Sequence, residues 1–129
     1  MKIAVYGTLR KGEVNHALMN HVQAKFIETK TVSGLEILAS NTLGFPVAVI
    51  KANAKAVVEI YEVAESQLPA LDRLESYKPD DLDRSMYHRV TLPSDTSTSV
   101  YVGNQKFWRN HGTKFKPVVD WLTFSRRGQ

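Results

Sequence analysis

Two short stretches of the sequence carry groups that could do chemistry. The first is YGTLRKGE, from Tyr6 to Glu13, which follows a short apolar run. Its glycine, Gly7, has two interpretations. It could let the backbone turn sharply after a strand, or it could let successive backbone N–H groups ahead of a helix point at an anion or a developing oxyanion. These residues alone leave both interpretations open.

The second group is the carboxylate of Glu75, in the segment LPALDRLESY. Leucines at three-residue spacing predict a helix over Glu65 to Ser76, with Ser66 as a candidate cap. The peptide dipoles disfavour a carboxylate at a helix C-terminus, and this effect raises its pKa, as burial does. Such an acid can accept and return a proton near neutral pH. The alternative is that Glu75 is an exposed glutamate on a frayed turn, which is equally consistent with this sequence.

Other reactive groups are few. The 129 residues include no cysteine, which excludes disulfides, thiolate catalysis and thiolate zinc sites. The histidines match no metal-binding spacing: they are His16, His21, His88 and His111. No nucleophile-elbow serine and no phosphate-binding loop occurs. We therefore expect no metal site, and any catalysis falls to carboxylates, tyrosines and backbone amides.

Hydrophobic patterning predicts many short strands and few helices. The predicted strands are Lys2–Tyr6, Lys25–Ser33, Leu35–Ala39, Val47–Ile50, Lys55–Val63, Tyr87–Leu92 and Thr98–Val102. A short helix is predicted over Asn15–Gln23 with Asn15 as its cap, residues 77–85 are predicted as loop, and helical content after Gly103 is weakly signalled. This order predicts an α+β fold, a small, mixed, mostly antiparallel β-barrel with flanking helices.

Composition indicates one ordinary globular domain. With 43% hydrophobic residues the chain can bury a core, and no repeat or linker divides it. We expect a single domain over residues 1–129, with residues 122–129 as a candidate flexible tail. The sequence shows no apolar run of about eighteen residues and no apolar segment of a signal peptide. We therefore expect a cytoplasmic protein without membrane contact.

The C-terminal segment mixes basic and aromatic residues. The formal net charge is +4, and the residues concerned are Lys114, Phe115, Lys116, Trp121, Phe124, Arg126 and Arg127. This mixture could hold single-stranded nucleic acid or an acidic partner. We favour a solvated terminus, which explains the same residues.

Several motifs, taken in order, resemble the gamma-glutamylcyclotransferase-like family. They are YGTL at the end of the first strand, FPVAV, VVEIYEV, LDRLESY, YHRV and the late pair DW. YGTL alone is moderately specific, whereas YGTL, LDxLE and YxR together are highly specific. The resemblance spans roughly Met1 to Trp121. In length as well as in motif order, the chain resembles the small gamma-glutamylamine cyclotransferases of this family.

The resemblance implies a fold, a reaction and a set of site residues. It implies a small barrel with a cavity at the end of the first strand, and a cofactor-independent lyase or acyltransferase. That enzyme would release 5-oxoproline and a free amine or amino acid from a gamma-glutamyl amine or peptide, by intramolecular attack of the α-amine. The matching positions are Glu75 for the catalytic glutamate and Tyr6, Gly7, Thr8, Leu9, Tyr87, Arg89 and Tyr101 for substrate binding.

The sequence departs from the family pattern at two positions. Val58 stands where many relatives carry glycine, and Ser76 stands where glycine often follows the glutamate. Either residue could narrow the cavity or shift the loop. The alternative is therefore a non-catalytic module on the same fold that binds a small carboxylate or a modified peptide end.

Overall fold

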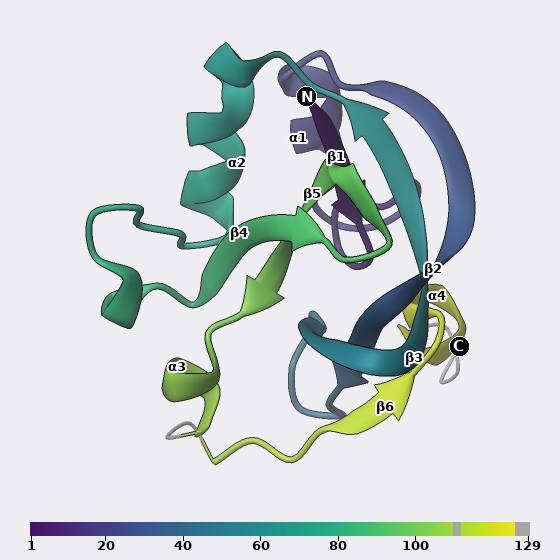
Figure 1. Cartoon of the computed structure of the whole chain (residues 1–129), viewed down its shortest axis with the longest axis vertical. Coiled ribbons are helices and arrows are strands. Elements are labelled where there is room, and N and C mark those ends of the chain that lie inside the picture. Colours follow the sequence, from purple (N-terminus) through teal and green to yellow (C-terminus); the bar gives the residue numbers. More distant parts are fainter. Residues whose placement is uncertain (110–111, 126–129) are drawn as a thin grey trace.

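Figure 1 shows the computed structural model of the chain, which describes residues 1–109 and 112–125. The strands are β1 (Lys2–Val5), β2 (Lys25–Ala39), β3 (Val47–Glu62), β4 (Tyr87–Leu92), β5 (Asp95–Gly103) and β6 (Lys116–Val118). The helices are α1 (His16–His21), α2 (Leu68–Leu74), α3 (Gln105–Arg109) and α4 (Trp121–Ser125), with short 3-10 turns η1 (Glu65–Gln67) and η2 (Leu82–Arg84). Of the residues singled out in the sequence, His111, Arg126 and Arg127 lie outside the described part.

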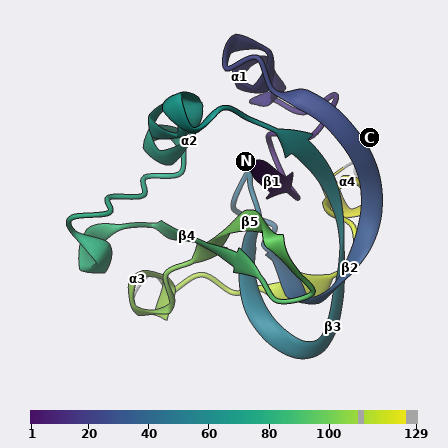
Figure 2. The same cartoon turned by 45° about the horizontal axis from the view of Figure 1, so that its top comes forward.

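The six strands form one curled sheet in the order β4-β5-β1-β3-β2-β6. β1 runs parallel to β5, and the other neighbouring pairs are antiparallel. The long β2–β3 hairpin curves around β1, as Figure 2 shows. The predicted α+β fold, a mostly antiparallel sheet curled towards a barrel with flanking helices, is confirmed.

A bulge in the β2–β3 hairpin explains one error in the predicted strands. We expected four strands between residues 25 and 63, but the structure has two long ones. Gly34 in β2, with φ +86°, lies opposite residues 51–54 of β3, and Asn53 there has φ 69°. A bulge of this kind bends a strand without ending it. It also interrupts the alternation of apolar residues from which strand ends are predicted.

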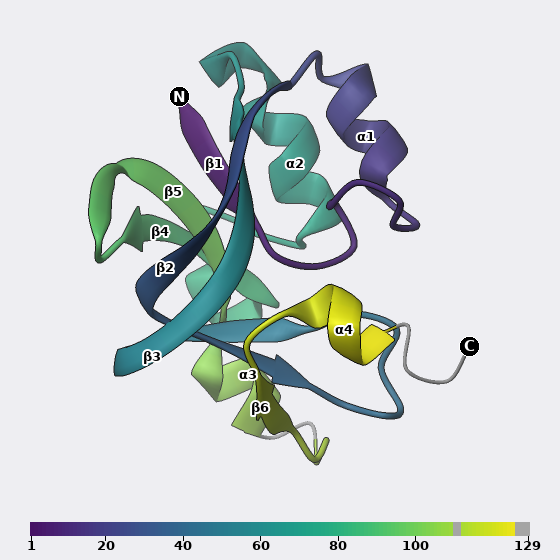
Figure 3. The same cartoon turned by 90° about the vertical axis from the view of Figure 1, so that its right-hand side faces the viewer.

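β1 is buried on both faces, and this burial positions the segment that follows it. Ile3 and Val5 pack in the cluster that includes Met19 of α1 and Leu71 of α2. Ala4 and its neighbours on the other face pack inside the curl of the sheet. Figure 3 shows α1 and α2 next to each other at one end of the molecule. The segment that follows β1 therefore starts from a strand that is fixed on one face by α1 and α2 and on the other face by the rest of the sheet.

Of the two predicted helix caps, Ser66 was wrong, because Gln67 precedes α2, whereas Asn15 does occupy the N-cap position of α1. The segment predicted as helix from Glu65 begins as the turn η1, and α2 follows without a capping side-chain bond. Asn15 occupies the position before α1, but it makes no cap bond. Its amide nitrogen instead donates to the hydroxyl of Thr8 at 3.0 Å. Asn15 thus ties the loop after β1 to the start of α1.

α4 occupies part of the predicted tail. Residues 122–125 are helical, and Trp121 is only 4% exposed and packs against Phe124 at 5.6 Å between ring centroids. The ammonium of Lys116 lies 5.1 Å from the same Phe124 ring. Trp121 is thus buried and Phe124 half-buried, with Lys116 beside the Phe124 ring. Among the described residues, no helix has the length and apolar character needed to cross a membrane.

Candidate active site

A cavity of about 240 Å³ opens where β1 ends. Seven of the eight predicted site residues line it: Tyr6, Gly7, Thr8, Leu9, Glu75, Tyr87 and Tyr101. Arg89 is the exception. The rest of the wall is mostly apolar and includes Val14, Phe45, Pro46, Leu74 and Met86. The structure thus brings a glutamate from the end of α2 and the loop after β1 to the same cavity, although they are far apart in the sequence.

Glu75 is a half-buried acid without a partner. It is the residue that ends α2, and its backbone N–H still bonds to Leu71 at 3.0 Å. Its carboxyl group makes no hydrogen bond or ion pair with any other described residue. Burial raises the pKa of Glu75 to about 7. A group with this pKa is present in both protonation states near neutral pH, which is the condition for acting as base and then as acid.

The loop after β1 presents unused backbone donors. Its carbonyl groups are occupied inside the loop, because Arg10 N–H bonds to Gly7 at 3.0 Å and Asn15 N–H bonds to Thr8 at 2.9 Å. No described group accepts a hydrogen bond from the N–H groups of Gly7, Thr8 or Leu9. Adjacent free N–H groups on the wall of a cavity form an anion-binding site. The cavity is therefore lined by a proton acceptor and by residues whose backbone N–H groups are free to donate hydrogen bonds to an anion.

Glycine is required at position 7 because Pro46 lies very close to its backbone, and not because of an unusual backbone torsion. Its φ is not positive, so the conformation does not depend on the missing β-carbon. A β-carbon built on Gly7 would instead lie 2.6 Å from the ring of Pro46, which also lines the cavity. A side chain here would push the loop away from Pro46. The torsional interpretation of this glycine was wrong, and its actual role is to let two cavity walls meet.

A buried ionic network holds the same loop from below. Arg10 is only 4% exposed, and its guanidinium donates to Glu59 of β3 at 2.9 Å and to Asp120 at 2.7 Å. Glu59 also accepts the N–H of Lys11 at 3.0 Å and the hydroxyl of Tyr61 at 2.8 Å. Burial opposes ionisation of Glu59, yet the hydrogen bonds from these groups hold its pKa below the ordinary value.

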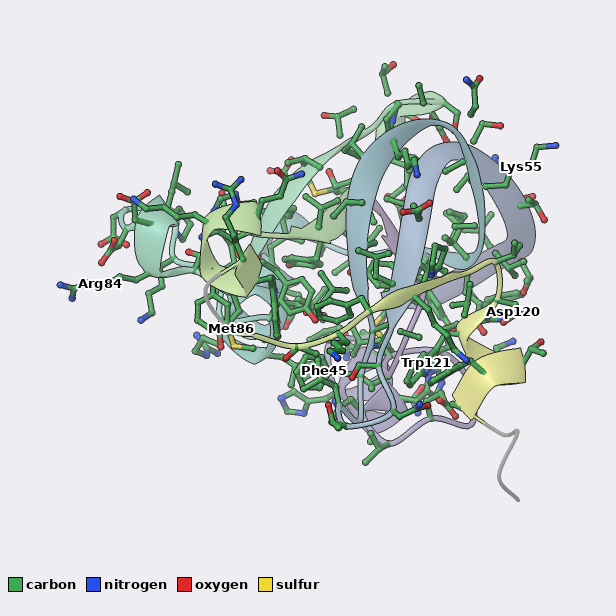
Figure 4. All side chains as sticks on the ribbon, turned by 90° about the horizontal axis from the view of Figure 1, so that it is seen from below. Phe45, Lys55, Arg84, Met86, Asp120 and Trp121 are labelled. Atoms are coloured by element: carbon green, nitrogen blue, oxygen red, sulfur yellow. The ribbon has the colours of Figure 1, made fainter. Side chains whose placement is uncertain are left out.

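The C-terminal segment completes this support. Asp120 stands just before α4, and the indole N–H of the next residue, Trp121, donates to Glu13 of the loop at 3.0 Å. Figure 4 shows both residues beside the start of α4, whereas Lys55 and Arg84 lie at the outer edges of the molecule. The loop after β1 is thus fixed at both ends by contacts that the sequence analysis did not predict.

Three tyrosine hydroxyls around the cavity donate to protein acceptors. Tyr6 bonds to the carbonyl of Tyr101 at 2.6 Å, and Tyr87 bonds to the carbonyl of Pro46 at 2.7 Å. Tyr101 bonds to a carboxylate oxygen of Asp72 at 2.5 Å. Burial raises the pKa of all three tyrosines, and the charge of the nearby acid at the end of α2 raises each further. These rings therefore stay neutral and hold the walls in place.

Arg89, the remaining predicted binding residue, faces Asp72 rather than the cavity. Its guanidinium lies 3.2 Å from a carboxylate oxygen of Asp72, and 5.7 Å from the ring of Tyr77. Two of the histidines, for which no metal site was predicted, contact backbone carbonyls: His16 contacts that of Leu9, and His88 contacts that of Leu82. Arg89 thus contacts Asp72 and does not line the cavity; the sequence analysis missed this partner, although Asp72 stands about one helical turn before Glu75.

Residues 3–123 match the family model described as gamma-glutamyl cyclotransferase, AIG2-like. The chain belongs to this family. The expected resemblance is therefore confirmed over nearly the whole of the described structure.

Relatives of this AIG2-like chain include curated proteins and solved structures. It is 32% identical over 100 residues to gamma-L-glutamyl-butirosin B gamma-glutamyl cyclotransferase of Niallia circulans, a match covering 77% of this chain and 61% of that protein. The chain spans about three fifths of the length of the curated relatives it matches.

The solved structures show the fold alone. An AIG2-like protein of Mus musculus aligns with a TM-score of 0.69 at 23% identity, covering 98% of this chain and 91% of that one. A variant allophanate hydrolase of Kluyveromyces lactis aligns with a TM-score of 0.76 at 14% identity, covering 99% of this chain and 21% of that one. Because the same fold occurs in an AIG2-like protein and in an allophanate hydrolase, the fold alone does not determine the activity, which depends on the residues of the site.

The two departures from the AIG2-like pattern lie outside the cavity wall. Val58 is fully buried in the core inside the curl and is not among the residues that line the cavity. Ser76 follows the glutamate with φ 50°, a left-handed conformation that glycine adopts more easily. Val58 therefore affects the packing of the core, whereas Ser76 places a strained backbone conformation just after α2.

Proposed function

We propose that the protein is a gamma-glutamyl cyclotransferase, which releases 5-oxoproline and a free amine or amino acid from a gamma-glutamyl amine or peptide. The observation that carries this proposal is the shared cavity, which is lined both by Glu75, with its pKa raised to about 7, and by Gly7, Thr8 and Leu9, whose N–H groups have no acceptor among the described residues. Membership of the AIG2-like family and the name of the Niallia circulans relative support it.

The reaction needs one base that also returns protons. The substrate's α-ammonium gives one proton to Glu75, and the freed nitrogen attacks the γ-carbonyl carbon, so that a C–N bond forms and the carbonyl oxygen becomes an oxyanion. As the intermediate collapses, the bond to the original amide nitrogen breaks. The nitrogen in the ring loses a second proton, and the departing amine gains two. The amine leaves as an ammonium ion, so charge and protons balance, and Glu75 carries the protons in succession.

The cavity supplies the remaining acceleration. The free N–H groups of the loop can hold the oxyanion or the α-carboxylate. Closure of the five-membered ring is intramolecular, so folding of the flexible glutamyl chain against the cavity wall contributes through orientation. No protein nucleophile is needed. The chain itself therefore contains every group that the reaction uses.

The test is 5-oxoproline release from a panel of γ-glutamyl amines, γ-glutamyl dipeptides and glutathione. We expect release by the native chain, with kcat/KM rising about tenfold per pH unit up to pH 7, because Glu75 must be ionised to accept the first proton. Glu75→Gln should lower kcat about 100- to 10,000-fold. Glu65→Gln, which changes an exposed glutamate of η1, is the matched control and should behave as native.

Two outcomes would contradict the proposal. Turnover by Glu75→Gln at the native rate would show that another group is the base. Binding of panel members without any release would instead support the alternative, a binding module on the same fold.

A further inference from the structure

The hydroxyl of Tyr101 can act only as an acceptor towards the cavity. A phenol has a single hydroxyl hydrogen, and lone pairs on the same oxygen. In Tyr101 that hydrogen lies in the 2.5 Å bond to Asp72. The free side of the oxygen can therefore accept a hydrogen bond, but it has no hydrogen to offer to an oxyanion or a carboxylate.

Asp72 is held so that this direction cannot reverse. An ionised carboxylate is an acceptor only, so Tyr101 must be the donor. Asp72 is 9% exposed, and Arg89 lies 3.2 Å from the same carboxylate oxygen that Tyr101 uses. The backbone carbonyl of Asp72 also accepts the N–H of Tyr77 at 2.8 Å, at the end of α2. Its backbone and side chain are thus both fixed.

The acceptor on Tyr101 lies close to the acid. Both residues line the same cavity, and after burial and Asp72 the charge of Glu75 further raises the pKa of the Tyr101 hydroxyl. No described Lys or Arg lines this cavity. A carboxylate and a neutral oxygen acceptor without a fixed cation between them suit a ligand group that is positively charged and carries several N–H hydrogens.

We propose that Asp72 is a positioning residue, which keeps the Tyr101 hydroxyl an acceptor so that Tyr101 and Glu75 together bind the substrate's α-ammonium group. The inference rests on the proposed function, because it divides that substrate between two parts of the site. The ammonium lies at the end of α2, and the loop amides are left for the anionic groups. Tyr101 then holds the nitrogen that Glu75 deprotonates, in line for attack on the γ-carbonyl.

The experiment compares two ligands that differ only in the ammonium group. One is γ-glutamyl butylamide, and the other is the butylamide of glutaric acid, which lacks the α-amine and can act only as a competitive inhibitor. Tyr101→Phe should raise KM for the first about tenfold, the size of a lost hydrogen bond to a charged group, and leave the inhibition constant of the second unchanged. Tyr77→Phe, in a neighbouring ring that does not line the cavity, should change neither constant.

Asp72→Ala tests the positioning role. It removes the acceptor of the Tyr101 hydroxyl hydrogen, which is then free to turn towards the cavity, so we expect the same rise in KM without a change in the inhibition constant. In the Tyr101→Phe background, Asp72→Ala should add nothing, because the hydroxyl through which it acts is absent. Loss of folded protein would lower the apparent kcat but would move neither constant.

The outcomes separate this inference from the proposed function. If Tyr101→Phe raises both constants equally, the hydroxyl supports the shape of the cavity and the inference is wrong. An unchanged KM would also overturn it. If the native chain releases no 5-oxoproline, both ligands are compared by calorimetry. Tighter binding of the α-amino compound, lost in Tyr101→Phe, would then support the ammonium site while the enzyme proposal fails, and equal binding would overturn both.

Discussion

Two glutamates near the same loop have opposite surroundings. Glu59 on β3 is 3% exposed and accepts hydrogen bonds from the Arg10 guanidinium, the Lys11 N–H and the Tyr61 hydroxyl. Its pKa is lowered although burial opposes ionisation. Glu75 at the end of α2 has no such partner, and burial raises its pKa to about 7.

The difference teaches that partners, more than burial, decide what a sheltered carboxyl does. The cation and donors around Glu59 replace the water it has lost, so it stays ionised and acts as a fixed anchor for the loop. Glu75 has lost water without replacement, so its two protonation states are close in free energy near neutral pH. Glu59 therefore suits structure, and Glu75 suits proton transfer.

The largest expected effect on stability comes from removing the charge of the anchor. Glu59→Gln leaves the buried Arg10 guanidinium with Asp120 as its one remaining anionic partner in the network, and we expect a loss of about 3 kcal/mol in the free energy of unfolding, the lower end of the cost of breaking a buried ion pair. Glu62→Gln on the same strand is the control, because Glu62 is exposed and pairs with the N-terminal ammonium, and should cost less than about 1 kcal/mol. Urea unfolding measures both. Equal losses in the two variants would remove the contrast with Glu75.

A second, smaller effect concerns Glu75 and has the opposite sign. Its pKa is about 7 in the folded protein against 4.5 when unperturbed, so the folded chain holds the proton more tightly. Below pH 4.5 both states are protonated and burial of the acid has no titration cost. As pH rises from 4.5 to 7 the unfolded chain ionises first, and stability falls; above pH 7 the loss is complete, on the order of 2–3 kcal/mol.

Glu75→Gln should therefore stabilise the protein at pH 8 and have little effect at pH 4. The measurement is the difference in unfolding free energy between variant and native chain across this range. Glu59 provides the internal contrast, since a lowered pKa contributes stability at neutral pH that is lost as pH falls through its folded value. A difference for Glu75→Gln that does not vary with pH would mean that its carboxyl has an ordinary pKa.

Sequence patterns predicted the elements better than the contacts between them. β4 has the bounds that alternation predicted, Tyr87–Leu92, and α2 follows the leucine spacing, because both signals are local. The anchor of the loop has no local signal, since Arg10 is separated from Glu59 by 49 residues and from Asp120 by 110. The available hints were a charged residue within the largely apolar segment VVEIYEV and the late pair DW, which contains Asp120.

The site residues show the same limit. The family resemblance named the residues around the cavity, but it could not tell which of them face the substrate. Arg89 was expected to bind substrate, and its partner Asp72 was not considered, because the two meet only when β4 lies beside α2. For Gly7 the sequence left a torsional and an anion-binding interpretation open and predicted no contact with Pro46, because that contact depends on how two distant loops approach.

The smallest expected effect concerns Ser76, the residue next to Glu75. The N–H of Ser76 bonds to Arg73 at 3.2 Å and that of Tyr77 bonds to Asp72 at 2.8 Å, the pattern of a Schellman motif, which favours glycine at the left-handed position. Ser76→Gly should relieve the φ of 50° and raise the unfolding free energy by about 0.5–1 kcal/mol. Because the same bonds remain, the pH midpoint of 5-oxoproline release should stay near 7. A shifted midpoint would show that the serine, and not burial alone, sets the protonation of Glu75, and would narrow the contrast with Glu59.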